Sequence, residues 1–199
     1  EEELELYDAS MSEIGSEERH RIAAEIESEV RDRVDGERVL SVEAKYEDSE
    51  GASVLINSNG FIGRHRGTQR WGMADVSLRD GEDRRPSGWA VAGSRSRTGL
   101  ASAESIARGA IAAADARVGG APIETAKLPM VVENRAVGRL LRYLLGALDG
   151  RALQQRSSFL EGKRGDRVGS EVLDIVDDPF IVKGFSSRRY DGEGIAARR

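Results

Sequence analysis

The sequence contains no cysteine, which excludes disulfide bonds, thiol catalysis and zinc sites built on cysteine thiolates. It has only two histidines, His20 and His65, so a histidine-rich metal site is not expected. No segment approaches the roughly 20 consecutive apolar residues that a membrane-spanning helix needs. We therefore expect a cytoplasmic protein without a membrane span, and a chain of 199 residues is long enough to form a core without cross-links.

Charge is unevenly distributed. Residues 1–50 contain 18 acidic and 6 basic side chains, whereas the other 149 residues contain 17 acidic and 24 basic ones. Arginine supplies 26 of the 30 basic residues, and its planar guanidinium suits forked contacts with carboxylates or phosphates. Two interpretations stay open: the two portions balance each other within the fold, or the arginines form a surface for nucleic acid or an acidic protein.

The first part of the chain has the pattern of an α+β unit. Ile22, Ile26, Val30 and Val34 recur every four residues and predict a helix that begins near Ser16 and ends at Asp35-Gly36. From residue 38 the period changes to two. This alternation predicts a meander of about five antiparallel strands, over residues 39–46, 52–57, 61–70, 71–79 and 89–97, with a tight turn at 58–60. An alanine-rich helix over 102–117 is expected to cover the sheet closely.

Gly119-Gly-Ala-Pro122 is the expected domain boundary. We predict a helix–meander–helix unit over residues 1–118 and the start of a second, α/β-rich domain over 122–199. In the second domain, residues 128–132 and 173–176 predict short strands. A leucine stripe between Val137 and Leu148 predicts an intervening helix, which Asp149-Gly150 ends. The expected fold class is therefore α+β, with an antiparallel meander covered by helices.

The residues alone form no catalytic constellation. A P-loop, a nucleotide-binding glycine fingerprint and a Gly-x-Ser-x-Gly motif are all missing. His20 is predicted on a solvated helix face, and His65 lies between two arginines, which disfavours a metal ion. Asp191 and Glu193 would share a face if extended. They could hold a divalent ion or a peptide amine, although ion pairs with Arg188 and Arg189 are the simpler interpretation.

Several motifs, in order, resemble the TldD/PmbA family, the modulators of DNA gyrase and their peptidase relatives. They are Leu128–Val132, the leucine-rich helix, Ser157–Leu160, Gly162–Gly165, Val168–Leu173, Asp177-Asp178-Pro179 and Tyr190–Gly194, preceded by Leu6-Tyr7-Asp8 and Val54–Gly60. The resemblance covers nearly the whole chain. Family members are longer at both ends, so we expect that this chain is part of a longer protein. The roles of Asp177, Asp178, Tyr190, Asp191 and Glu193 within these motifs are not specified by the resemblance.

The family has two branches, and one motif separates them. TldD-type members carry His-Glu-x-x-x-His on the helix after the first strand of the C-terminal region, and the histidines help to hold a catalytic zinc. In this sequence Asn134 and Arg139 stand at the histidine positions and Arg135 stands at the glutamate position. Guanidinium groups cannot ligate a cation and repel it. The resemblance therefore implies the PmbA (TldE) branch, which has no zinc motif.

What the resemblance implies about function is a metal-free subunit of a TldD-type metallopeptidase system that processes modified or unfolded peptides. No cofactor is expected in this chain, and zinc is expected only in a TldD-type partner. The partner is either such a subunit or a second copy of this chain, and the chain itself is expected to be non-catalytic. Two alternatives stay open: an arginine-rich module that binds nucleic acid or acidic protein, and a peptidase whose zinc ligands lie outside this sequence.

Overall fold

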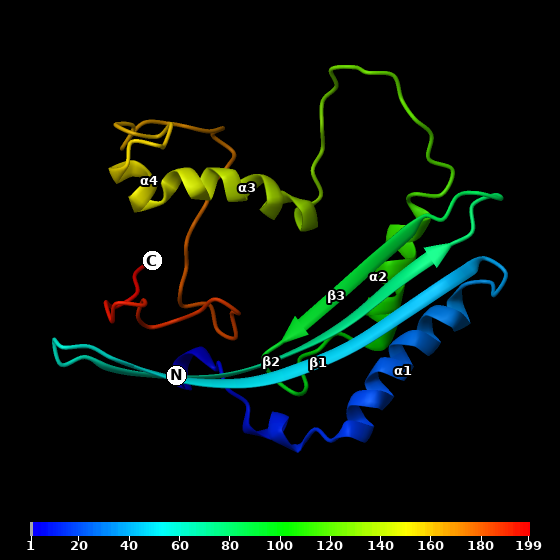
Figure 1. Cartoon of the computed structure of the whole chain (residues 1–199), viewed down its shortest axis with the longest axis horizontal. Coiled ribbons are helices and arrows are strands. Elements are labelled where there is room, and N and C mark those ends of the chain that lie inside the picture. Colours follow the sequence, from blue (N-terminus) through cyan, green and yellow to red (C-terminus); the bar gives the residue numbers. More distant parts are fainter. Residues whose placement is uncertain (1) are drawn as a thin grey trace. The chain divides into compact units, whose positions relative to one another are not determined.

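The structure is a computed structural model that describes residues 2–199, except for the side chains of Glu2 and Arg135. Two short 3₁₀ helices open it, followed by a helix, three strands and a second helix (Figure 1). Two further helices follow a long connection. The elements are η1 (Glu2–Leu4), η2 (Ala9–Glu13), α1 (Ser16–Arg33), β1 (Val39–Ile56), β2 (Ile62–Leu78), β3 (Ser87–Ser94), α2 (Ala103–Asp115), α3 (Asn134–Leu148) and α4 (Gly150–Gln154).

The chain forms two compact units. One contains the residues up to Ala121 together with Asp177–Arg199, and the other is Pro122–Val176. The predicted division at residues 119–122 coincides with the first break between the units. The end of the chain differs from the prediction, because residues 177–199 pack with the first unit and not with the segment that precedes them.

The sheet is an antiparallel meander in the order β1-β2-β3. The predicted α+β class is confirmed, but the predicted number of five strands is wrong. The expected gap between strands 39–46 and 52–57 and the expected break between Arg70 and Trp71 are both absent, because β1 and β2 pair without interruption through these points. Asp48, Ser49 and Gly51 have turn propensity, yet each has a partner across the ladder. Pairing with a long neighbouring strand therefore overrides the local preference.

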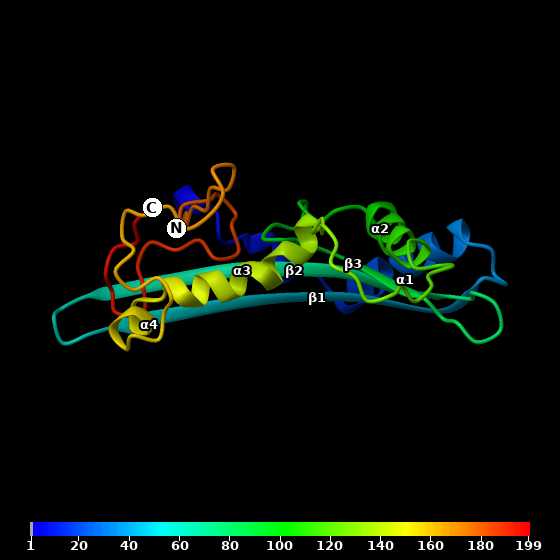
Figure 2. The ribbon, with the colours of Figure 1, turned by 90° about the horizontal axis from the view of Figure 1, so that it is seen from above.

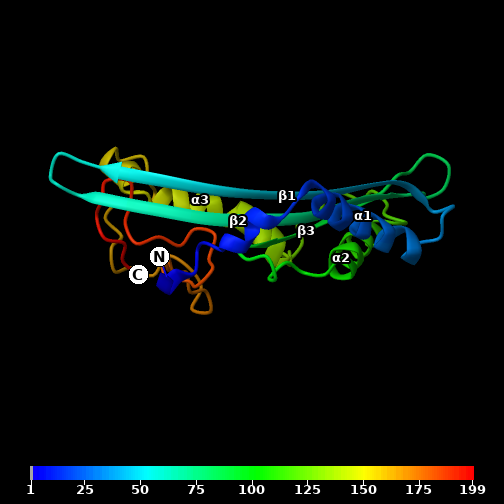
Figure 3. The same ribbon diagram turned by 90° about the horizontal axis from the view of Figure 1, so that it is seen from below.

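Helices α1 and α2 cover one face of this sheet. Ala74, Val76 and Leu78 of β2 and Ala90 of β3 point to that face and form the core with Ile26 of α1, together with Val30, Val34, Ile106, Ala107, Ala110 and Ala114. The predicted stripe of α1 is confirmed. Figures 2 and 3 show α1 and α2 at the end of the sheet that lies far from the β1–β2 turn. We call this side of the sheet the helix-covered face and the other side the second face.

The β1–β2 hairpin extends well past the end of β3 (Figure 1). Its turn has Gly60 at φ +89°, a conformation that favours glycine, and the Asn57 side chain accepts hydrogen bonds from the N–H groups of Asn59 and Phe61. On the second face, residues 177–199 pack against the hairpin. The Phe185 ring stacks on Trp71 with centroids 4.5 Å apart, and Tyr190 meets Phe61 edge-on at 5.0 Å.

The Pro122–Val176 unit consists of α3, α4 and turns. The predicted leucine-rich helix is confirmed as α3, but Leu140, Leu145 and Leu148 of its stripe are about half exposed. The predicted strands at 128–132 and 173–176 are wrong, since neither segment is a strand in the described chain. A strand needs a neighbour for its backbone groups, and Val131, in the middle of the first segment, is 99% exposed.

Helix α2 approaches β3 closely at Gly88, where little space is left for a side chain. A Cβ atom at Gly88 would lie 2.1 Å from the backbone nitrogen of Ala114 and 2.4 Å from the carbonyl carbon of Ala113. Because helix backbone must move to make room, we expect Gly88→Ala to lower the free energy of unfolding by about 1–3 kcal/mol. Chemical denaturation measures this. Gly51→Ala, in the same sheet with open space around it, is the control and should change stability little; equal effects of the two variants would contradict the proposed close approach.

Candidate functional site

The start of α3 carries the positions that the resemblance aligns with the zinc motif of TldD-type proteins. Asn134 is the first residue of the helix and Arg139 follows in its second turn, and both are exposed. The side chain of Arg135 lies outside the described part of the chain. The groups available here are an amide and a guanidinium. A guanidinium keeps its positive charge at any ordinary pH and has no lone pair for a metal, so these residues do not fit a zinc ion.

The histidines do not supply a zinc site elsewhere. His20 lies on α1, where it is exposed, and His65 lies on β2 at the second face of the sheet. Within residues 2–199, apart from the two undescribed side chains, no group of three histidine, aspartate or glutamate residues is arranged to hold a metal ion. The donor set of the described residues therefore does not fit the family's zinc.

The carboxylates near the end of the chain shape turns. Asp178 accepts a hydrogen bond from the N–H of Phe180 at 2.9 Å, as expected for a turn at Pro179, and pairs with Arg199 at 3.2 Å. Asp191 accepts the N–H groups of Glu193 and Ile195, both at 2.9 Å. These bonds, that from Ile195 first, lower the pKa of Asp191. The expected ion pairs of Asp191 or Glu193 with Arg188 and Arg189 are not found among the described residues.

Asp177, Tyr190 and Glu193 complete the predicted set. Asp177 and Glu193 are exposed, and the Glu193 carbonyl accepts a hydrogen bond from the Asn57 side chain at 3.0 Å. Tyr190 packs over Gly63, where a Cβ atom would lie 2.5 Å from the tyrosine ring. The structure therefore brings Tyr190, Asp191 and Glu193 together at the β1–β2 turn. They join the end of the chain to the hairpin, which is a structural role that their sequence spacing did not indicate.

A pocket of about 440 Å³ lies on the second face, between the hairpin and the segment 185–192. Ser53, Leu55 and His65 of the hairpin line one part of it, and Arg95, which follows β3, lines another. Arg95 is only 8% exposed. Its guanidinium donates to the carbonyls of Gly184 at 3.0 Å, Phe185 at 2.7 Å and Thr68 at 3.3 Å, so it ties the end segment to the sheet.

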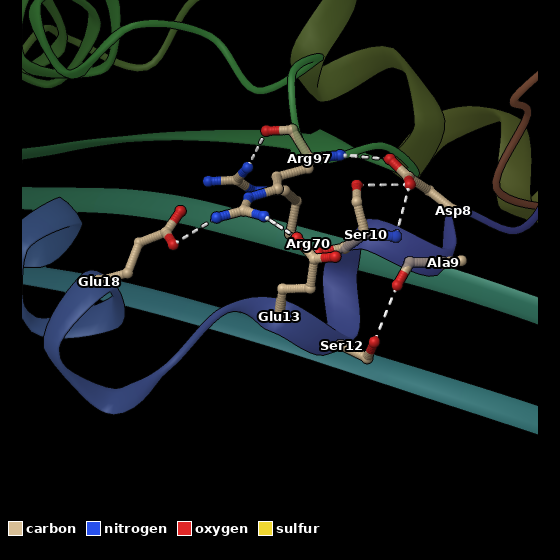
Figure 4. A network of polar contacts seen from close by, with 8 residues as sticks. All are labelled: Asp8, Ala9, Ser10, Ser12, Glu13, Glu18, Arg70 and Arg97. Atoms are coloured by element: carbon tan, nitrogen blue, oxygen red, sulfur yellow. Dashed lines mark hydrogen bonds and ion pairs between the residues drawn. The ribbon is translucent and has the colours of Figure 1, made fainter.

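A polar network centred on Asp8 and Arg97 connects the first residues of the chain to the sheet (Figure 4). Asp8 accepts the Ser10 hydroxyl at 2.6 Å, the Ser10 N–H at 3.0 Å and the Arg97 N–H at 2.9 Å. The Arg97 guanidinium pairs with Glu13 and Glu18, each at 2.8 Å. Buried Arg70 donates to the Arg97 carbonyl. Sequence reasoning missed this network, because its members lie up to 89 positions apart.

The network also explains part of the uneven charge. Glu13 and Glu18 belong to the acidic first 50 residues, and Arg97 belongs to the basic remainder. Lys183 pairs in the same way with Glu5 at 3.0 Å. These contacts favour the interpretation that the two portions balance each other within the fold.

None of the helices in the described chain has the length and apolar character needed to cross a membrane.

Comparison with known proteins identifies two consecutive family matches. Residues 10–118 match the PmbA/TldA metallopeptidase central domain, and residues 125–199 match the PmbA/TldA metallopeptidase C-terminal domain. The chain is 30% identical over 173 residues to a protein from Methanothermobacter thermautotrophicus named metalloprotease, covering 82% of this chain and 36% of that protein. It is also 30% identical over 77 residues to metalloprotease PmbA of Escherichia coli O157:H7, covering 39% of this chain and 17% of that protein.

Two crystal structures share the fold, and both are named as modulators of DNA gyrase. The Bacteroides thetaiotaomicron structure has a TM-score of 0.90 and 31% identity, and the match covers 98% of this chain and 44% of that one. The Thermotoga maritima structure has a TM-score of 0.87 and 25% identity with the same coverage. The chain thus spans about a third of the archaeal relative and less than half of each of these structures.

The lowered pKa of Asp8 predicts a specific acid sensitivity. Hydrogen bonds from the Ser10 hydroxyl first, and then from the Arg97 N–H, hold the pKa of Asp8 below its ordinary value. A carboxylate whose pKa is depressed by folding stabilises the protein above its unfolded-state pKa, and this contribution is lost as pH falls through the native value. We expect Asp8→Asn to cost about 1–2 kcal/mol at pH 7, because it weakens these bonds, and to cost less below pH 3.

Urea denaturation between pH 7 and pH 2 measures this difference. Asp83→Asn is the matched control, because Asp83 is exposed and its carboxylate makes no hydrogen bond in the described part of the chain. A cost of Asp8→Asn that stays constant over the whole pH range, or a cost shared by Asp83→Asn, would contradict the proposed contribution of the ionised Asp8.

Proposed function

Because this chain belongs to the TldD/PmbA metallopeptidase family, we propose that it is the metal-free, PmbA-like partner in a TldD-type zinc peptidase system. In this role it contributes to the proteolytic processing of modified or unfolded peptides, while the zinc and the cleavage chemistry reside in a TldD-type subunit. We propose further that the protein acts in the cytoplasm and that its partner is a TldD-type chain or a second copy of itself.

One observation carries this proposal: the residues at the start of α3. Asn134 and Arg139 occupy the positions of the two zinc-binding histidines of the motif, and both side chains are exposed on the helix. A hydrolytic zinc needs neutral imidazole or carboxylate ligands and an open position for water. A guanidinium offers neither a lone pair nor a negative charge. With an asparagine and an arginine at these positions, the chain keeps the helix but does not supply the zinc ligands of the TldD-type motif.

The edge of β2 supports a role in holding peptide. β3 pairs with β2 only over Arg70–Ser77, so the stretch of β2 from Ile62 to Gln69 has no third strand in the described chain. Two backbone groups there are already used, because the Thr68 N–H donates to the Leu6 carbonyl at 3.0 Å and the Thr68 carbonyl accepts a hydrogen bond from Arg95 at 3.3 Å. The rest of this edge offers backbone donors and acceptors to an extended peptide, which can add as a further strand.

The alternative of an arginine-rich binding module has no comparable support. Arg97 and Arg66 are engaged by Glu13, Glu18 and Glu50 of the same chain. Arginines paired in this way present little free positive charge to a nucleic acid. We therefore propose a role in peptide processing and not in binding nucleic acid or an acidic protein.

The proposal predicts a clear division of labour. The purified protein should contain no stoichiometric zinc by elemental analysis and should not hydrolyse unfolded peptides, since no three histidine, aspartate or glutamate side chains in the described part of the chain are grouped to hold a metal ion. Addition of a zinc-loaded TldD-type subunit should give peptide cleavage that a chelator abolishes. The TldD-type subunit assayed alone, with and without chelator, is the control.

Two outcomes would overturn the assignment. The first is tightly bound, stoichiometric zinc in the isolated protein together with chelator-sensitive hydrolysis. The second is identical cleavage by the TldD-type subunit whether or not this protein is present, combined with failure of the two proteins to co-purify from their host.

A further inference from the structure

The pocket between the hairpin and the segment 185–192 has an unusual balance of charge. Four of its lining residues have basic side chains: His65, Arg95, Arg188 and Arg189. The single acidic residue in the lining is Asp191. Its carboxylate already accepts two backbone N–H groups, from Glu193 and Ile195. The charge available to a ligand in this pocket is therefore positive.

Arg95 is the strongest contributor, because its charge is buried without a carboxylate. Its three described hydrogen bonds all go to backbone carbonyls, and no acidic side chain of the described chain pairs with it. Burial accordingly lowers the pKa of Arg95. Nearby Arg97, in contrast, pairs with two glutamates. A buried guanidinium of this kind is stabilised by an anion that approaches it.

Arg188 and Arg189 add exposed positive charge at the same pocket. Arg188 donates to the carbonyl of Ser186 at 3.3 Å, and Arg189 makes a long contact of 3.8 Å with Glu3, which is 90% exposed. An exposed ion pair at this distance is weak, so a ligand anion can displace it. Both arginines are thus able to reorient toward a bound anion.

The rest of the lining is apolar or uncharged. Leu55, Phe185 and Tyr190 line the pocket beside the basic residues, together with Ser53 and Ser186. A free inorganic anion would make no use of the apolar side chains. A carboxylate attached to an apolar residue would use both kinds of contact at once, as the last residue of a peptide does.

We propose that this pocket binds the C-terminal carboxylate of a peptide, with the basic residues receiving the carboxylate and Leu55, Phe185 and Tyr190 contacting the last side chain. This inference rests on the proposed role in peptide processing and adds a substrate class to it, namely peptides with a free C-terminus and an apolar last residue. The pocket lies beside the unpaired edge of β2 that we propose for strand addition.

Binding of short labelled peptides tests the proposal. The probe is an N-terminally fluorescein-labelled pentapeptide, Ala-Ala-Ala-Ala-Leu, with a free C-terminal carboxylate, compared with the same peptide as its C-terminal amide. Fluorescence anisotropy with the purified protein should give a Kd at least roughly 10-fold lower for the free acid, the difference expected for a charge-assisted contact. The measurement needs no partner and no zinc, so it stands apart from the cleavage assay.

Arginine variants test which residues of the pocket bind the peptide carboxylate. The double variant Arg188→Ala, Arg189→Ala should weaken binding of the free acid about 10-fold and leave the amide unchanged. Arg64→Ala is the matched control, because Arg64 lies on the same strand as His65 but projects from the opposite face. Circular dichroism confirms that each variant is folded.

The outcomes separate the two proposals. Equal affinity for acid and amide, loss of binding in Arg64→Ala alone, or inorganic phosphate binding more tightly than the free-acid peptide would each overturn the carboxylate site. Any of these could occur while the zinc-bearing partner still cleaves peptides with this protein present. Selective binding of the free acid that depends on Arg188 and Arg189 would support the site even if no cleavage is found.

Discussion

The long, uninterrupted pairing of β1 with β2 is the constraint on which the other features depend. Every residue from Ser41 to Ile56 has a partner on β2, and a two-residue period then assigns each side chain to one face or the other. The helix-covered face receives Val76 and its apolar neighbours, and the second face receives Trp71, His65 and Gly63. A shift of one residue would exchange these sets, burying charges in the core and removing the pocket.

The outer half of the hairpin differs from the rest of the sheet, because β3 is much shorter than β1 and β2. β3 ends at Ser94, so in the described part of the chain the outer half of the hairpin has no third strand. Residues 177–199 supply the missing contacts through Phe185, Tyr190 and the carbonyls that Arg95 holds. A segment that packs over part of a sheet leaves gaps at its margin. The basic pocket is one of them, and the charge of Arg95 in its lining is not neutralised, because Arg95 donates to carbonyls and not to a carboxylate.

The proposed division of labour in the peptidase system rests on two residues at the start of α3. The family's central and C-terminal domains match most of the chain, whereas the resemblance aligns Asn134 and Arg139 with metal-binding positions. In the proposed role, the chain contributes a scaffold that holds peptide and supplies no metal ligands. The free edge of β2 and the basic pocket are both compatible with that role, since one recognises the backbone and the other recognises the end of a chain.

The sequence by itself determined the α+β class, the helices at 16–33 and 103–115, the turn at Gly60 and the lack of zinc ligands at Asn134 and Arg139. These follow from local periodicity, glycine conformation and side-chain chemistry, all of which are properties of short segments. Only the tertiary structure decided that β1 continues through a turn-prone stretch, that residues 177–199 return to the first unit, and that Arg95 is buried beside them. Those outcomes depend on contacts between residues that are far apart in the sequence, such as Asn57 and Glu193, which are 136 positions apart. The free energy of such contacts cannot be inferred from the pattern of any one segment.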